Sequence, residues 1–342
     1  LSDGFLFDVD GTLKDVPGEP DGGERMSKTI SQGAYPAFER YGMVFAYMGK
    51  FEDMPKFPEW EFFHSYDDLE MVSYSNIYPC NWLQVFDNIP DQMHTSQLHS
   101  PSMRVISEDD DGSYPSTAFN PVFSQVPVME YVSVRDNTAM AFSAGRRVGK
   151  ERIWVRLQDV ILPNLTLHPH VAEEGKHARY FHRVYMARWY VPVDNENSIV
   201  FGLRMFGESV DPFRTGRKDL CGYDKTDFLD GQTGHRSYHE MQRAPGDWDV
   251  VSSQRRIARH PMENPTKEDV GVYLNRKNLR LAVRGKNPHM AQETIHAAAN
   301  SGEQNLVYTN NTILDIPVQA DRDDDELVRE VCKKMVEKGA RH

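Results

Sequence analysis

Hydrophobic and polar positions alternate along four stretches in the middle of the chain. These stretches are VMEYVSVRD (128–136), ERIWVRLQDVI (151–161), YFHRVYMARWYVPVD (180–194) and SIVFGLRMF (198–206). A period of two places successive side chains on opposite faces of an extended strand. Four such segments, each bounded by polar residues, predict an antiparallel sheet.

Three other segments have the spacing of helices. Residues 84–99 (QVFDNIPDQMHTSQLH) carry apolar residues at irregular helical spacing and contain no β-branched run. Residues 265–300 and 323–338 also show helical apolar spacing. The segment 323–338 begins with acidic residues and ends with lysine, the distribution that the helix dipole favours.

The first fifty residues have a different pattern. Short apolar alternations there are divided by Gly and Pro clusters, which indicates a small all-β piece with turns. The Pro-rich aromatic stretch FEDMPKFPEWEF (51–62) is typical of a linker laid on a surface, so we expect two domains, 1–52 and 53–342. We expect an exposed acidic loop at 107–116 and a lid or surface excursion at 214–240.

Composition restricts the function. The 342 residues include 51 acidic and 39 basic side chains, a net charge of −12, which argues against a nucleic-acid partner and favours a small organic substrate. The sequence contains no run of about 18 apolar residues, so it predicts no membrane span. The three cysteines form no metal or disulfide pattern, and no secretory leader pattern is present, so we expect a cytoplasmic protein.

The segment FLFDVDGTL (5–13) has the D-x-D-G-T pattern of a phosphoaspartate phosphatase. In such an enzyme Asp8 would be the nucleophile and Asp10 would handle the leaving-group proton. The motif requires a helix soon afterwards, but Pro17, Gly18 and Pro20 interrupt that region. We therefore interpret Asp8 and Asp10 as turn residues of a β domain.

Two histidines and a carboxylate form the main candidate site. Asp91 precedes His94 by three residues, and His99 follows His94 by five. Two imidazoles and one carboxylate suit a mononuclear iron centre with open coordination positions. Five residues turn a regular helix by about 140°, so the helix must widen or break between the two histidines. Two partly buried, hydrogen-bonded histidines without a metal are the alternative.

The residues around these histidines resemble a known family. NW…DN…D-x-x-H-x-x-x-L-H resembles the mononuclear-iron motif of Rieske oxygenase terminal (alpha) subunits, in the branch with phthalate and phenoxybenzoate dioxygenases and aryl O-demethylases. The resemblance extends over nearly the whole chain. It includes FDVDGTLKDVPGEP, RWYVPVDNENSIVFGLR, Q-R-R-I (254–257), Glu263, Asp269 and Gly271.

This resemblance implies an α+β fold. Its parts would be the C-terminal part of a Rieske-type β domain and a helix-grip-like catalytic domain, whose antiparallel sheet is flanked by helices. It implies that His94, His99 and Asp247 hold mononuclear Fe(II), with Asp249 as the alternative carboxylate. Asp91 would be catalytic, by connecting to a cluster histidine of a neighbouring subunit in a homotrimer or hexamer.

The chain departs from the family at the cluster. A [2Fe–2S] Rieske centre needs two thiolates and two imidazoles. Where the family has Tyr-His-Gly-Trp, this sequence has Ser2, Asp3, Gly4 and Phe5, and no cluster ligand is present. The [2Fe–2S] centre is therefore expected only from an N-terminal segment missing from this sequence or from a partner.

The implied reaction is O₂ activation at Fe(II), with electrons from a reductase or ferredoxin. An aromatic, carboxylated substrate would then undergo ring dihydroxylation or O-demethylation. Four arginines in pocket-forming or lid-like regions are possible carboxylate partners, and none is assigned to the site: Arg135, Arg204, Arg214 and Arg217. The alternatives are a structural subunit without a cluster and a zinc hydrolase that uses the same ligands.

Overall fold

The computed structural model describes most of the chain. The described residues are 4–64, 67–99, 122–123, 125–135, 137, 139–171, 179–181, 184–211, 214, 216–227, 233–243, 245–286 and 300–339. The chain divides into two compact units, Leu1–Lys56 and Phe57–His342. The predicted acidic loop at 107–116 lies outside the described residues.

The first unit is a set of short hairpins. Strand β1 (Leu6–Phe7) pairs with β2 (Leu13–Asp15), and β3 (Ala37–Arg40) pairs with β4 (Met43–Ala46), both antiparallel. Asp8 and Asp10 lie in the turn between β1 and β2, where Asp10 Oδ1 accepts a hydrogen bond from the Thr12 amide at 2.9 Å. They are turn residues, as predicted.

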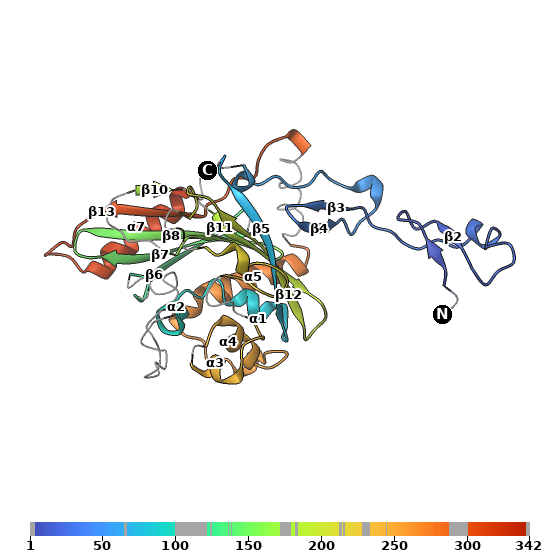
Figure 1. Ribbon diagram of the computed structural model, residues 1–342. Helices are drawn as coiled ribbons and strands as arrows, with labels where there is room; N and C mark the ends of the chain where they lie inside the picture. The colour runs from blue at the N-terminus through green and yellow to red at the C-terminus, as the bar shows by residue number, and fades with distance from the viewer. Residues whose placement is uncertain are drawn as a thin grey trace. The chain divides into compact units, whose positions relative to one another are not determined.

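The second unit is built on one nine-stranded antiparallel sheet (Figure 1). Its main path runs β10-β13-β8-β9-β11-β12-β5, and β7 joins β6 to β8. The strands are β5 (Glu70–Tyr78), β6 (Val128–Val134), β7 (Ala139–Val148), β8 (Arg152–Ile161), β9 (Leu165–Pro169), β10 (Arg179–Phe181), β11 (Val184–Pro192), β12 (Ser198–Phe206) and β13 (Asn310–Asp315).

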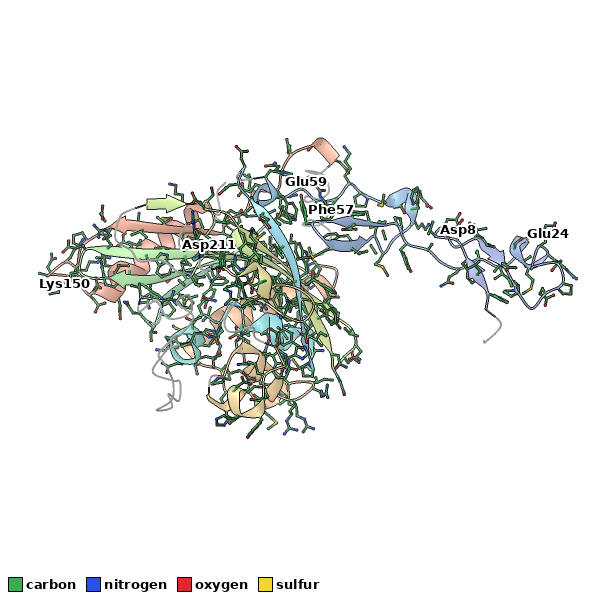
Figure 2. All side chains as sticks on the ribbon, viewed as in Figure 1. Asp8, Glu24, Phe57, Glu59, Lys150 and Asp211 are labelled. Carbon is green, nitrogen blue, oxygen red and sulfur yellow. The ribbon has the colours of Figure 1, made fainter. Side chains whose placement is uncertain are left out.

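Strand β8 is the centre of this sheet. It pairs along its length with β7, and its other edge pairs with β13 and then with β9. The turn between β7 and β8 contains Gly149, whose φ of 59° is accessible to glycine without strain. Figure 2 labels Lys150 at the end of this hairpin.

The described residues also form α-helices, all in the second unit. They are α1 (Trp82–Asp87), α2 (His94–Leu98), α3 (Tyr238–Arg243), α4 (Asp247–Ser253), α5 (Val270–Val283) and α7 (Asp324–Gly339). Short 3₁₀ helices are η1 (Met26–Lys28), η2 (Phe51–Asp53), η3 (Glu61–Phe63), η5 (Lys218–Leu220), η7 (His260–Met262) and η8 (Lys267–Asp269). No helix among the described residues is both long and apolar enough to cross a membrane.

The main core lies between one face of the sheet and helices α1, α4 and α5 (Figure 1). Phe142 of β7, Val160 of β8 and Tyr190 of β11 belong to this core, and they meet Phe86 of α1 and Val251 of α4. Helix α7 packs on β6, β7 and β8. Both faces of β7 and β8 are therefore covered, which explains their nearly continuous burial.

The α+β class with a large antiparallel sheet is confirmed, and so is the helix at 323–338. The four alternating stretches form strands of this sheet, but 180–194 contains part of β10 and the whole of β11. The prediction of one helix over 84–99 is wrong. Helix α1 ends at Asp87 and α2 begins at His94, with Pro90 between them. The expected surface linker at 51–62 also contains core residues, because Trp60 and Phe62 are buried.

Two further expectations are met only in part. In the segment 265–300, helix α5 covers residues 270–283, while residues 287–299 lie outside the described part. In the expected lid at 214–240, Asp224 is buried, and its Oδ1 accepts a hydrogen bond from the Ile77 amide of β5 at 2.8 Å. That part of the segment is therefore attached to the sheet edge.

The packing of α7 on the sheet generates a stability prediction. A Cβ at Gly145 would lie 2.3 Å from Cys332 Sγ and 2.9 Å from Val328 Cγ1, both on α7. Because overpacking a core costs about 1–3 kcal/mol, Gly145→Ala should lower the free energy of unfolding by that amount in urea titrations. Adding Cys332→Ala makes room, so the double variant should lose less than the sum of the single losses. Additive losses would contradict the close approach.

Candidate metal centre

Two short helices carry the histidines. The Asn81 side chain accepts a hydrogen bond from the Leu83 amide at 3.0 Å and caps the start of α1. After the break at Pro90, Asp91 Oδ1 accepts a hydrogen bond from the Met93 amide at 3.0 Å, just before α2. The side chains of Asn81 and Asp91 thus fix where α1 and α2 begin.

The helix breaks at the second histidine. His94 is the first residue of α2, and His99 follows its end with φ −99° and ψ 11°, outside the helical range. Of the two solutions that the five-residue spacing allowed, the chain uses a break instead of a widened turn. The two imidazole centroids lie 5.3 Å apart, with their planes at 73°.

Asp247 brings the third group from a distant part of the chain. It is the first residue of α4, and its Oδ1 lies 3.1 Å from His99 Nε2 and 3.4 Å from His94 Nε2. Trp248 Nε1 donates a hydrogen bond to the Ile77 carbonyl of β5 at 2.8 Å. Gln84 Nε2 of α1 donates to the Val251 carbonyl at 3.1 Å. These two bonds fix α4 against the sheet and against α1.

Asp249, the alternative carboxylate, has other partners. Its Oδ2 accepts a hydrogen bond from the Gly246 amide at 2.7 Å and lies 2.6 Å from Arg236 Nη2. The side chain therefore caps the start of its own helix and is neutralised by an arginine. Asp247 is the carboxylate that faces the two histidines.

The site is buried and electrostatically coupled. Asp247 and His99 are buried, and His94 is half-buried. Burial raises the pKa of Asp247, but the neighbouring His99 and His94 imidazoles outweigh it and hold this pKa well below its usual range. Burial lowers the pKa of His94, whereas Asp247 and Asp91 raise it, and the result is about 10. The carboxylates of Asp247 and Asp91 thus favour a positively charged group at this site.

Asp91 lies on the outer side of His94. Its Oδ2 is 3.7 Å from His94 Nδ1, and its side chain is 32% exposed. Asp91 also lines a larger cavity of about 490 Å³, together with Asp87. Asp87 pairs with Arg276 at 2.7 Å, and burial raises the pKa of Asp87 to about 7 although Arg276 opposes the rise. Asp87 is therefore engaged away from the histidines.

The three side chains fit a divalent metal ion. Their ligand atoms all lie within 4.8 Å of one another. Neighbouring ligands of an octahedral ion at about 2.0–2.2 Å are about 3 Å apart, close to the separations of Asp247 Oδ1 from the two imidazoles. Asp247 Oδ1 and His94 Nδ1 are buried and have no well-oriented hydrogen-bond partner among the described residues. A carboxylate oxygen left in this state is suited to a cation.

A small cavity of about 40 Å³ adjoins the three side chains. Strands β8, β9 and β11 contribute Arg156, Gln158, His168 and Arg188 to its lining. Sequence reasoning missed all four. The sequence did offer a signal, because an arginine or a glutamine stands in the middle of otherwise apolar strands. Burying such a polar group costs free energy unless it has a partner.

The four arginines considered from the sequence lie elsewhere. None of them is among the described residues that line the 40 Å³ cavity. Arg204 is fully buried with Asp227 at 3.0 Å, and Arg217 is an exposed partner of Asp219. Arg214 is exposed beside Glu208, and the Arg135 guanidinium lies 5.6 Å from the ring centroid of Trp60.

Comparisons with known proteins show the family of the chain. A tert-butanol monooxygenase / tert-amyl alcohol desaturase oxygenase subunit from Aquincola tertiaricarbonis is 39% identical over 97% of this chain and 70% of that protein. A phenoxybenzoate dioxygenase alpha subunit from Ectopseudomonas oleovorans is 27% identical over 81% of this chain and 63% of that protein. No family model matches the chain.

Solved structures share the fold. Dicamba monooxygenase bound to 3,6-dichlorosalicylic acid superposes with a TM-score of 0.51 at 13% identity, over 83% of this chain and 79% of that structure. The relatives are oxygenase subunits, and the match to the first of them extends over nearly all of this sequence. The chain belongs to the alpha subunits of the Rieske oxygenases, a family of oxidoreductases.

Proposed function

We propose that His94, His99 and Asp247 hold a mononuclear Fe(II) ion and that this centre is where the chain oxidises its substrate. The arrangement of one buried carboxylate between two imidazoles carries the proposal. Two imidazoles and one carboxylate are the donor set of non-haem iron oxygenases, and they leave coordination positions free. Iron bound there would supply reductive activation of O₂.

The chain's own residues prepare this chemistry. Helix α4 orients Asp247, and the break at the end of α2 lets His99 turn back toward it. The apolar core beneath α1 and α4 keeps bulk water away from the buried carboxylate. Ile89 and Phe123 give the adjoining cavity part of its apolar lining.

The same proposal includes the reaction, the domains and the electron donor of the whole protein. The chain would hydroxylate an aromatic substrate, by ring dihydroxylation or by O-demethylation, in the cytoplasm. Residues 1–52 would complete a Rieske domain with a cluster-binding segment, and residues 53–342 would be the catalytic domain. A reductase or ferredoxin would supply electrons through a [2Fe–2S] centre, in a homotrimer or hexamer.

A matched pair of variants tests the metal centre. We expect Asp247→Asn to lose bound iron after anaerobic loading with Fe(II) and desalting, because the amide removes the charge that binds the cation. Asp249→Asn lies on the same helix turn and should retain about one iron per chain, since Asp249 bonds to Gly246 and Arg236 instead. Iron is measured by mass spectrometry.

Three outcomes would contradict the iron proposal. Equal iron in both variants would exclude Asp247 as a ligand, and no iron in the unmodified protein would favour a structural subunit. Retention of zinc in preference to iron, with hydrolysis that does not depend on O₂, would support the hydrolase alternative.

Asp91 is proposed as the residue that connects the iron centre to the electron donor. Asp91→Asn should keep its iron but lose at least tenfold in product formation driven by a [2Fe–2S] donor, because the carboxylate beside His94 is removed. Hydrogen peroxide contains oxygen already reduced by two electrons, so peroxide-driven turnover should be largely preserved. Equal losses in both assays would mean that Asp91 instead supports the iron site itself.

A further inference from the structure

Three neighbouring strands of the sheet hold the chain between α1 and α2 and the start of α2. One side chain from each strand donates a hydrogen bond to this segment. The pairs, in the strand order β6, β7 and β8, are the Tyr131 hydroxyl with the Pro90 carbonyl (3.0 Å), Arg146 Nη2 with Thr95 Oγ1 (3.0 Å) and Arg156 Nη1 with Gln92 Oε1 (3.3 Å). Gln92 and Thr95 are buried, so the two arginines hold the inner side of the segment. Tyr131 instead reaches the residue before Asp91, whose side chain is 32% exposed.

The Pro90 carbonyl belongs to the peptide group that leads into Asp91. Because a peptide group is planar, a hydrogen bond to this carbonyl also fixes the plane that contains the Asp91 nitrogen. On its other side, Asp91 Oδ1 accepts the hydrogen bond from the Met93 amide at 3.0 Å. Asp91 is thus held from both sides, while its Oδ2 lies 3.7 Å from His94 Nδ1.

Helix α5 leaves room for the ring of Tyr131 at Gly271. A Cβ at this position would lie 2.2 Å from Tyr131 Cε1 and 2.7 Å from Cζ, separations that are too short for real atoms. Gly271 is the second residue of α5, where alanine would otherwise be the better helix former. Phe142, the cross-strand partner of Tyr131, packs on the same ring, with the centroids 5.8 Å apart. The ring is therefore fixed between the sheet and α5.

The Tyr131 hydroxyl acts as the donor in its contact with Pro90. Burial and the negative charge of Asp91 raise the pKa of the Tyr131 phenol above its usual value, so the phenol stays protonated near neutral pH. A carbonyl oxygen has no proton to give, so it accepts the hydrogen bond. The contact therefore does not titrate near neutral pH.

We propose that Tyr131 is a positioning residue, which holds Asp91 beside His94, and that Gly271 admits its ring beside α5. This inference rests on the proposed function, because it takes Asp91 as the residue that connects the iron centre to the electron donor. It adds a residue of the sheet that sets how much of the time Asp91 is in the connecting position.

Hydrogen exchange of the metal-free protein tests this inference without iron. Tyr131→Phe removes the hydroxyl and keeps the ring, so Asp91 should leave the Met93 amide more often. We expect the Met93 amide to exchange about threefold to tenfold faster, the effect of one lost hydrogen bond, in mass spectrometry with single-residue fragmentation. Gly271→Ala should have the same effect, because its Cβ displaces the ring.

Ser133→Ala is the matched control. Ser133 lies two residues after Tyr131 on β6, so the two side chains are on the same face of the strand. Asn278 Nδ2 of α5 donates a hydrogen bond to Ser133 Oγ at 3.3 Å. This variant also loosens β6 from α5 but leaves the bond to Pro90 intact, so the Met93 amide should exchange at its normal rate.

The midpoint potential of bound iron shows whether the effect reaches the proposed metal centre. The Asp91 carboxylate beside His94 makes the imidazole a stronger donor, which favours Fe(III) over Fe(II). Tyr131→Phe should therefore raise the potential by part of the shift that Asp91→Asn causes. In the Asp91→Asn background it should cause no further shift, since Tyr131 acts through Asp91.

Two kinds of result would overturn the inference. Unchanged Met93 exchange in Tyr131→Phe, or equal acceleration along the whole of α2 and α5, would make Tyr131 an ordinary packing residue. A further shift of the potential in the Asp91→Asn background would mean that Tyr131 acts on the metal centre by another route. Failure of the unmodified protein to bind iron would contradict the proposed function, whereas the exchange result would still decide the role of Tyr131.

Discussion

A buried carboxylate has to be neutralised, and the arrangement of the second unit around Asp247 follows from that requirement. Removing a carboxylate from water costs several kcal/mol unless a cation or good hydrogen bonds replace the solvent. Here two imidazoles from one short segment face a single oxygen from a segment about 150 residues later. Helix α4 has to start at the correct place on β5, and the chain has to break after α2, for this contact to form.

The helices and the sheet contribute different residues to the site. Short helices supply the proposed ligands, where capping bonds and helix ends orient each side chain individually. The strands beneath supply Arg156, Gln158, His168 and Arg188, whose positions are fixed by the ladder of the sheet. Among the described residues, Arg156 Nε, Gln158 Nε2 and Arg188 Nε have no hydrogen-bond partner, and burying them in this state costs stability. Such a cost is expected where a polar ligand later takes the place of water.

Part of this architecture could be predicted from the sequence, and the reason differs between elements. Strands β8, β11 and β12 alternate clearly, and α7 has an apolar stripe with acids at its start, so local pattern and tertiary structure agree. Strand β7 (AMAFSAGRRV) was missed, because its small residues favour a strand only when both faces are covered. His94 and His99 stood out by spacing, but the prediction of one continuous helix over 84–99 missed the break at Pro90.

The candidate site could also be predicted from the sequence only in part. Asp247 was proposed from a resemblance, because no local signal distinguishes it from Asp249; only the three-dimensional contact with the histidines does so. Arg156 and Gln158 could not be associated with the site from sequence, since strand order and register decide which side chains share a cavity. Arg204 was considered for the substrate pocket, but it pairs with Asp227, 23 residues later, in the fully buried interior.

The most direct test of the account is an anomalous difference map, measured at the iron absorption edge from a crystal grown with Fe(II) under anaerobic conditions. The account predicts one peak at about 2.0–2.2 Å from an imidazole nitrogen of His94, from one of His99 and from a carboxylate oxygen of Asp247. A crystal without a peak there, in which the two histidines bond directly to Asp247, would contradict it.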